Sequence, residues 1–138
     1  MSVSPAKRKI VAERARYLCE YCFAPQKYSP QSFSVEHILP ISKKGSDDLE
    51  NLALACQGCN SFKSDKIFAT DPLNEKKVRL FNPRKDIWSK HFVWSDDFLE
   101  IIGLTAKGRG TVKLLKLNRE EVVNLRELLY LFGEHPPK

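Results

Sequence analysis

Four cysteines in two Cys-x-x-Cys pairs constrain this sequence more than any other feature. The pairs are Cys19 with Cys22 and Cys56 with Cys59, and the segment between them is long enough to fold. Two such pairs are typical of a tetrahedral zinc site, in which four thiolates bind the ion at about 2.3 Å and leave no position open for water. The alternative is a set of buried or redox-active cysteines at coincidental spacing. We predict a structural zinc site that holds the fold and takes no part in catalysis.

The composition describes an ordinary globular protein with a moderate positive charge. Of the 138 residues, 42% are hydrophobic and 29% are charged, which excludes a disordered or fibrous chain. The formal net charge of +6 favours an anionic partner, such as nucleic acid or an acidic membrane surface. No apolar run approaches the roughly 20 residues of a membrane span. We therefore expect a cytoplasmic protein without membrane contact, and a reducing compartment favours metal-bound cysteines over disulfides.

The first half of the chain predicts helices and short strands around the cysteine pairs. Ser4-Pro5 is a typical helix start, and apolar residues continue at helical spacing as far as Leu18. Alternating residues over 33–37 predict a short strand, and the apolar run over 49–55 predicts a second one. From Asn60 onward the sequence suits a helix.

The second half of the chain predicts a hairpin followed by a helix. Residues 91–95 and 98–104 have the pattern of two strands, and residues 107–110 that of a flexible basic turn. Residues 111–117 are ambiguous. Asn118 is a plausible cap for a last helix with apolar residues at helical spacing.

Four polar residues lie between and beside the cysteine pairs, namely Glu36, His37, Asn51 and Asn60. Each has an ordinary interpretation when taken singly: a structural histidine, a surface charge, and asparagines in turns or caps. Their joint order and spacing are more specific. The pattern runs Glu36-His37-Ile38-x-Pro40, then Gly45, Asn51-Leu52, Cys56-x-x-Cys59-Asn60 and Lys63. Over about residues 15–67 it resembles the HNH (His-Asn-His) endonuclease family.

The resemblance implies an α+β fold. Its centre would be a ββα-metal nuclease core over about residues 15–67, a short two-stranded hairpin plus a helix stapled by the four-cysteine zinc site. An N-terminal helix would precede the core, and a hairpin-plus-helix extension over about residues 71–138 would follow it. We expect all of this to form a single domain over residues 1–138.

The resemblance also implies a metal-dependent endonuclease that hydrolyses phosphodiester bonds in DNA. His37 would be the general base that activates water, and Asn51 would orient the His37 imidazole or its loop. Glu36 and Asn60 would bind Mg²⁺ or another divalent ion, since hard ions prefer oxygen ligands. Asn60 stands where the family name has histidine, and Glu36 where aspartate is usual.

One geometric condition applies to this site, because neighbours on a regular strand point to opposite faces. Glu36 and His37 can share a site only if the strand ends or twists between them. Lys63 would contact phosphate or be an ordinary exposed lysine on a helix.

Two other functions are compatible with the same residues. One is a non-catalytic zinc-ribbon module that binds nucleic acid, in which His37 is structural. The other, within the nucleases, is an endonuclease that resolves branched DNA. Duplex DNA is the expected partner, and branched DNA and RNA are alternatives.

Overall fold

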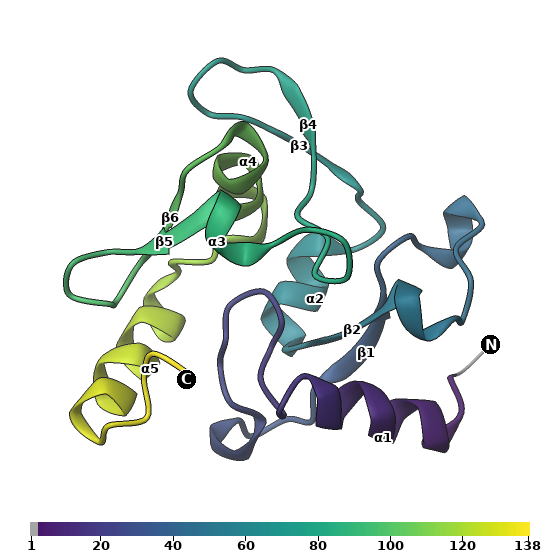
Figure 1. Cartoon of the computed structure of the whole chain (residues 1–138), viewed down its shortest axis with the longest axis horizontal. Coiled ribbons are helices and arrows are strands. Elements are labelled where there is room, and N and C mark those ends of the chain that lie inside the picture. Colours follow the sequence, from purple (N-terminus) through teal and green to yellow (C-terminus); the bar gives the residue numbers. More distant parts are fainter. Residues whose placement is uncertain (1–2) are drawn as a thin grey trace. The chain divides into compact units, whose positions relative to one another are not determined.

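The computed structural model describes residues 3–138, and these form two compact units (Figure 1). The first unit takes the chain up to Ile67 together with Asn82–Lys85, and the second takes Phe68–Phe81 and Asp86–Lys138. The single domain predicted over residues 1–138 thus contains two compact units, which are described separately here.

The first unit opens with helix α1, Pro5–Arg14. The hydroxyl of Ser4 accepts a hydrogen bond from a backbone N–H of the first turn, as an N-cap does. The helix ends earlier than the predicted Leu18, because Arg16 and Tyr17 both adopt left-handed backbone conformations with φ of 57°. This reversal turns the chain into the first cysteine pair.

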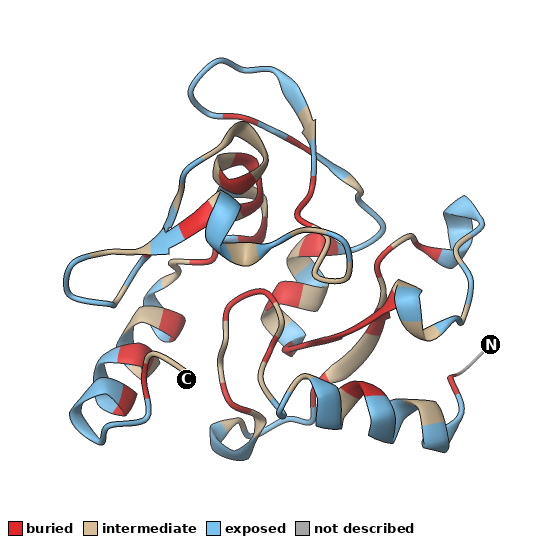
Figure 2. Ribbon diagram, viewed as in Figure 1, coloured by how far each residue is buried: buried red, intermediate tan, exposed pale blue. Residues whose placement is uncertain are grey.

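An antiparallel hairpin of β1 (Ser34–His37) and β2 (Leu52–Ala55) forms the centre of the first unit. Its register remains regular to the end of β1, where His37 lies opposite Leu52. Every residue of β2 is buried (Figure 2). The observed strand is shorter than the one predicted over 49–55, because residues Leu49–Asn51 form a 3₁₀ turn, η3.

Helix α2 spans Gln57–Lys63 and contacts both strands of this hairpin. It begins three residues before the predicted Asn60, because the second cysteine pair supplies its cap. The sulfur of Cys56 accepts the backbone N–H of Cys59 at 3.4 Å. The order β1, β2, α2 matches the predicted ββα core. Two other 3₁₀ turns, η1 (Gln26–Tyr28) and η2 (Ile41–Lys43), lie in its connections.

The second unit combines two small hairpins with three helices. In chain order its elements are β3 (Phe68–Thr70), β4 (Lys77–Arg79), α3 (Trp88–His91), β5 (Phe92–Trp94), β6 (Ile101–Gly103), α4 (Ala106–Leu115) and α5 (Glu120–Leu131). The antiparallel pair of β5 and β6 confirms the predicted hairpin. The pair of β3 and β4 was not predicted from the sequence.

The basic turn predicted over residues 107–110 is wrong, since these residues lie inside α4. Thr105 caps this helix by accepting the backbone N–H of Gly108 at 3.1 Å. Gly110 serves close packing: a Cβ at this position would lie 2.9 Å from Val78 Cγ2 and 3.2 Å from Ala69 Cβ. The glycine thus allows α4 to pack directly against β3 and β4.

The predicted cap of the last helix is also wrong. Helix α5 has Arg119 at its N-cap, and no side chain caps it. The side chain of Asn118 instead bonds both backbone groups of Ile101, at 2.7 and 2.9 Å, and so joins the start of α5 to β6. Within the described residues, no helix is long and apolar enough to cross a membrane.

Candidate zinc centre and active site

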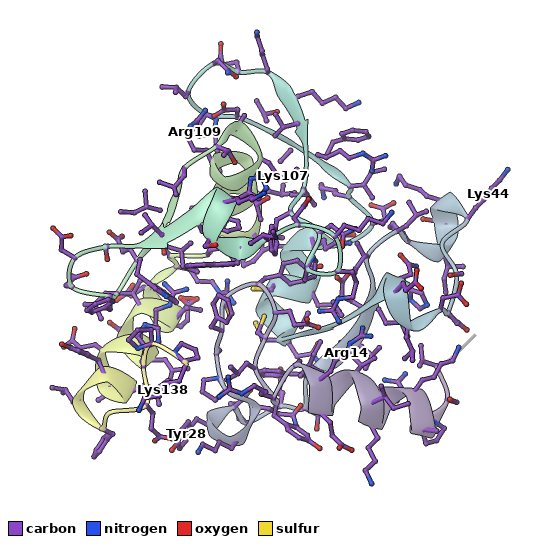
Figure 3. The ribbon with its side chains drawn as sticks, in the orientation of Figure 1. Arg14, Tyr28, Lys44, Lys107, Arg109 and Lys138 are labelled. Atoms are coloured by element: carbon purple, nitrogen blue, oxygen red, sulfur yellow. The ribbon has the colours of Figure 1, made fainter. Side chains whose placement is uncertain are left out.

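The four cysteines converge in the first unit, as their spacing predicts. All four cysteines are buried, none of them is in a disulfide, and their sulfur atoms lie within 4.8 Å of one another. Cys22 Sγ and Cys56 Sγ are 3.6 Å apart. A tetrahedron with Zn–S bonds of about 2.3 Å separates its sulfurs by about 3.8 Å, so the cluster fits zinc. Sulfur atoms, yellow in Figure 3, lie beside α2.

Backbone N–H groups turn toward the sulfurs, as in a metal-binding knuckle. The N–H of Cys22 donates to Cys19 Sγ at 3.5 Å, in the same way as Cys59 does to Cys56. Burial raises the pKa of Cys19, whereas the hydrogen bond with Cys19 lowers the pKa of Cys56. Burial disfavours the negatively charged thiolates of such a cluster. A divalent cation neutralises them and so stabilises the folded cluster.

His37 lies at the end of β1, and one nitrogen of its ring contacts an aspartate. Its Nε2 is 2.6 Å from Asp47 Oδ1, and its side chain is 15% exposed. An ionised carboxylate only accepts hydrogen bonds, so Nε2 carries a proton, and in the neutral imidazole Nδ1 has the lone pair. The hydrogen bond from His37 also lowers the pKa of Asp47, which keeps this carboxylate ionised. The imidazole is thus fixed in the tautomer that leaves Nδ1 basic.

Asp47 is the site residue that sequence reasoning missed. It lies in the turn between η2 and η3. Its backbone carbonyl oxygen accepts a hydrogen bond from Lys7 Nζ at 2.7 Å. Lys7 comes from α1, so α1 helps to place the turn. The sequence places Asp47 next to Asp48 in a turn, and nothing in the pattern distinguishes the one that contacts His37.

Asn51 holds the loop that follows β1. Its Oδ1 accepts the N–H of Leu39 at 2.8 Å, and its Nδ2 donates to Leu39 O at 3.0 Å and to Ser46 O at 2.8 Å. Gly45 packs so closely against this loop that a Cβ there would lie 1.7 Å from Leu39 O. The structure thus places Asn51 against the loop, whereas the imidazole is held by Asp47.

Glu36 points away from His37 into the interior. Its Oε2 is 3.0 Å from Lys63 Nζ, its Oε1 accepts a hydrogen bond from the Tyr21 hydroxyl, and its side chain is 4% exposed. Burial raises the pKa of Glu36, and the charge of Lys63 opposes that rise. The structure therefore differs from the expected pairing of Glu36 with Asn60 at an ion. The strand stays regular, so neighbours face opposite sides, and both carboxylate oxygens have protein partners.

Lys63 is neither a phosphate contact nor an exposed helix lysine, since its side chain is only 2% exposed. Besides Glu36, its ammonium group donates to the backbone carbonyls of His37 at 3.3 Å and Ile38 at 3.1 Å. It thus ties α2 to the end of β1.

Asn60 lies on α2 one turn before Lys63, and residues three apart on a helix are neighbours on one face. Its side chain is partly exposed, and within residues 3–138 its amide has no hydrogen-bond partner. An amide oxygen of this kind can bind a hard divalent ion. The Asn60 side chain therefore fits the divalent ion that the sequence pattern implies.

Comparison with known proteins gives one match. No curated protein and no solved structure matches the chain. A family model does match the segment that contains both cysteine pairs, the hairpin and α2, and it indicates nuclease activity in general. Residues 19–66 match the family model of the HNH endonucleases, which confirms the resemblance seen in the sequence.

Proposed function

We propose that this protein is a metal-dependent endonuclease that hydrolyses phosphodiester bonds in DNA, with His37 as general base. The observation that carries the proposal is the orientation of one imidazole. Asp47 holds Nε2 at 2.6 Å, and Nδ1 has no hydrogen-bond partner within residues 3–138. A histidine with its proton fixed on one nitrogen presents the other to a water molecule, and imidazole is the side chain most often used for such proton transfer.

The reaction is an in-line displacement at phosphorus. His37 Nδ1 accepts a proton from water, and the resulting hydroxide oxygen forms a bond to the phosphorus. The bond from phosphorus to the 3′ oxygen breaks, and this oxygen leaves with the electron pair and takes a proton from solvent. Asp47 stabilises the imidazolium that forms, because its carboxylate remains hydrogen-bonded to Nε2 throughout.

Asn60 is the side chain that would hold a divalent ion such as Mg²⁺. When bound, the ion neutralises charge that develops on the phosphate and leaving oxygens. We assign Glu36 a different role from the expected one, as an anchor for Lys63. Its two oxygens contact Lys63 and Tyr21, and its side chain is buried.

The direct test is cleavage by the purified protein of supercoiled, linear and branched DNA and of RNA, with and without added Mg²⁺. Omitting Mg²⁺ is preferable to adding a chelator, which would also remove zinc. We expect DNA cleavage that depends on Mg²⁺ and is lost in His37→Ala. If the protein binds DNA but no metal supports cleavage, a zinc-dependent binding module is the better description.

A further inference from the structure

The β3–β4 hairpin presents an outward face with two cations and one aromatic ring. Phe68 is opposite Arg79 in the register, and Thr70 is opposite Lys77. These residues alternate with Ala69 and Val78, so all four lie on the face away from α4. All four are exposed and none is acidic. Exposed residues of this hairpin are pale blue in Figure 2.

The ring of Phe68 orders both cations. Lys77 Nζ lies 4.2 Å from the ring centroid, and Arg79 Cζ lies 5.3 Å from it. Both distances are within the range of cation–π contacts. Long basic side chains on a surface normally lose rotamer freedom when they bind a ligand. Here part of that freedom is already restricted, although both charges stay accessible to solvent.

The opposite face of the hairpin is rigidly supported. Ala69 is buried, and Gly110 of α4 packs against it and against Val78. Arg109, on the same helix and labelled in Figure 3, forms two hydrogen bonds to the carboxylate of Asp71, at 2.9 and 2.8 Å. Asp71 directly follows β3, so this ion pair fixes the end of the strand against α4.

We infer that the outward face of the β3–β4 hairpin binds the phosphate backbone of the DNA on which the protein acts. Two cations held on one side of a rigid two-stranded ribbon match a row of phosphates, and a ribbon of this kind is narrow enough for the major groove of duplex DNA. The inference rests on the proposed function for the identity of the ligand. Phe68 acts as a platform that positions Lys77 and Arg79, and it reads no base.

The experiment measures DNA affinity as a function of salt in a His37→Ala background, which prevents cleavage. Each phosphate contact contributes about 0.9 to the slope of log K against log salt. We expect Lys77→Gln/Arg79→Gln to weaken binding and to reduce the slope by about 1.8. The matched control is Lys90→Gln/Lys113→Gln, which removes the same charge from exposed positions on α3 and α4 of the second unit. It should change the slope little.

Phe68→Ala provides an independent test, because it leaves every charge in place. Loss of the platform should weaken binding by about two- to fivefold, the factor that corresponds to an exposed cation–π contact, with the slope nearly unchanged. The inference is overturned if the hairpin variants bind like the control pair. Cleavage by the parent protein is assayed on the same DNA. If the hairpin variants weaken DNA binding but the parent protein does not cleave DNA, only the proposed function is refuted. If the parent protein cleaves DNA but the hairpin variants bind it normally, only this inference is refuted.

Discussion

At the scale of single residues, the orientation of His37 decides what chemistry the first unit can perform. A histidine on a strand is commonly structural, and its sequence position alone does not show which nitrogen is free. The 2.6 Å contact between Nε2 and Asp47 assigns the tautomer. This assignment makes His37 and Asp47 separately testable.

Replacement of His37 by alanine should abolish most cleavage and preserve the fold. Without a general base, water must lose its proton to solvent, which typically costs 10²–10⁴-fold, roughly, in rate. Single-turnover cleavage, zinc content and DNA affinity are the measurements. Asn60→Ala should differ, because higher Mg²⁺ should partly restore its activity and should not restore that of His37→Ala. Wild-type cleavage by His37→Ala would exclude the mechanism.

Replacement of Asp47 by asparagine should slow the reaction and leave binding unchanged. The amide oxygen can still accept the Nε2 proton, but it lacks the charge that stabilises an imidazolium. We expect kcat to fall by about 10- to 100-fold, as when other histidine-orienting partners are removed, with KM and DNA affinity preserved. Asp48→Asn is the matched control, since it removes the neighbouring acid from the same turn. Equal effects of the two substitutions would show that Asp47 acts only through the charge of the turn.

At the scale of secondary-structure elements, the distance between β1 and α2 depends on a buried ion pair. Lys63 on α2 bonds Glu36 and two backbone carbonyls at the end of β1. The pair therefore aligns the strand that carries His37 with the helix that carries Asn60. A buried charge without its partner is strongly unfavourable, so this alignment should be sensitive to either member of the pair.

Lys63→Met should destabilise the protein by about 3–5 kcal/mol, because it leaves the Glu36 carboxylate buried without its cation. The free energy of unfolding in urea measures this effect, and the exposed Lys66→Met is the control. Glu36→Met/Lys63→Met should recover part of the loss, because no unpaired charge remains. If the double variant is stable and still cleaves DNA with Mg²⁺, Glu36 is not a required ion ligand. If the double variant regains stability but does not cleave DNA at any Mg²⁺ concentration, the result would support Glu36 as an ion ligand.

At the scale of the whole molecule, the first unit depends on the cysteine cluster. Cys19 and Cys22 meet Cys56 and Cys59 across more than thirty residues of chain, and the hairpin and its loops lie between the two pairs. The cluster closes this loop at a buried point. The second unit has an apolar core of its own, with Leu115 and Ile101 almost fully buried.

Cys56→Ser should therefore remove zinc and unfold at least the first unit. Zinc binding in such sites amounts to roughly 10–16 kcal/mol, comparable to the roughly 5–15 kcal/mol that stabilises a typical domain. Zinc per chain and the far-ultraviolet circular dichroism spectrum are the measurements. A folded, zinc-free Cys56→Ser protein that cleaves DNA normally would disprove a structural zinc site.

The sequence alone determined the parts of this protein that depend on local spacing. Two Cys-x-x-Cys pairs predicted the metal cluster, alternation predicted β1 and the β5–β6 hairpin, and the ordered polar residues indicated the HNH family. These features are visible in sequence because each depends on spacing along the chain, within a cysteine pair, a strand or an ordered motif. The basic turn predicted at 107–110 failed for the converse reason. Gly110 is conformationally permissive in isolation, and only its packing against Ala69 and Val78 explains its place in a helix.

Tertiary structure alone decided which polar groups face one another. Glu36 and Lys63 are hydrophilic in any sequence pattern, yet both are buried because each neutralises the other. Asp47 reaches His37 because the loop held by Asn51 brings two distant segments together, and no local rule favours it over Asp48. Side-chain pairing across the chain depends on the full three-dimensional arrangement. The sequence therefore identified His37 and Asn51 as candidates, and the fold determined which groups they contact.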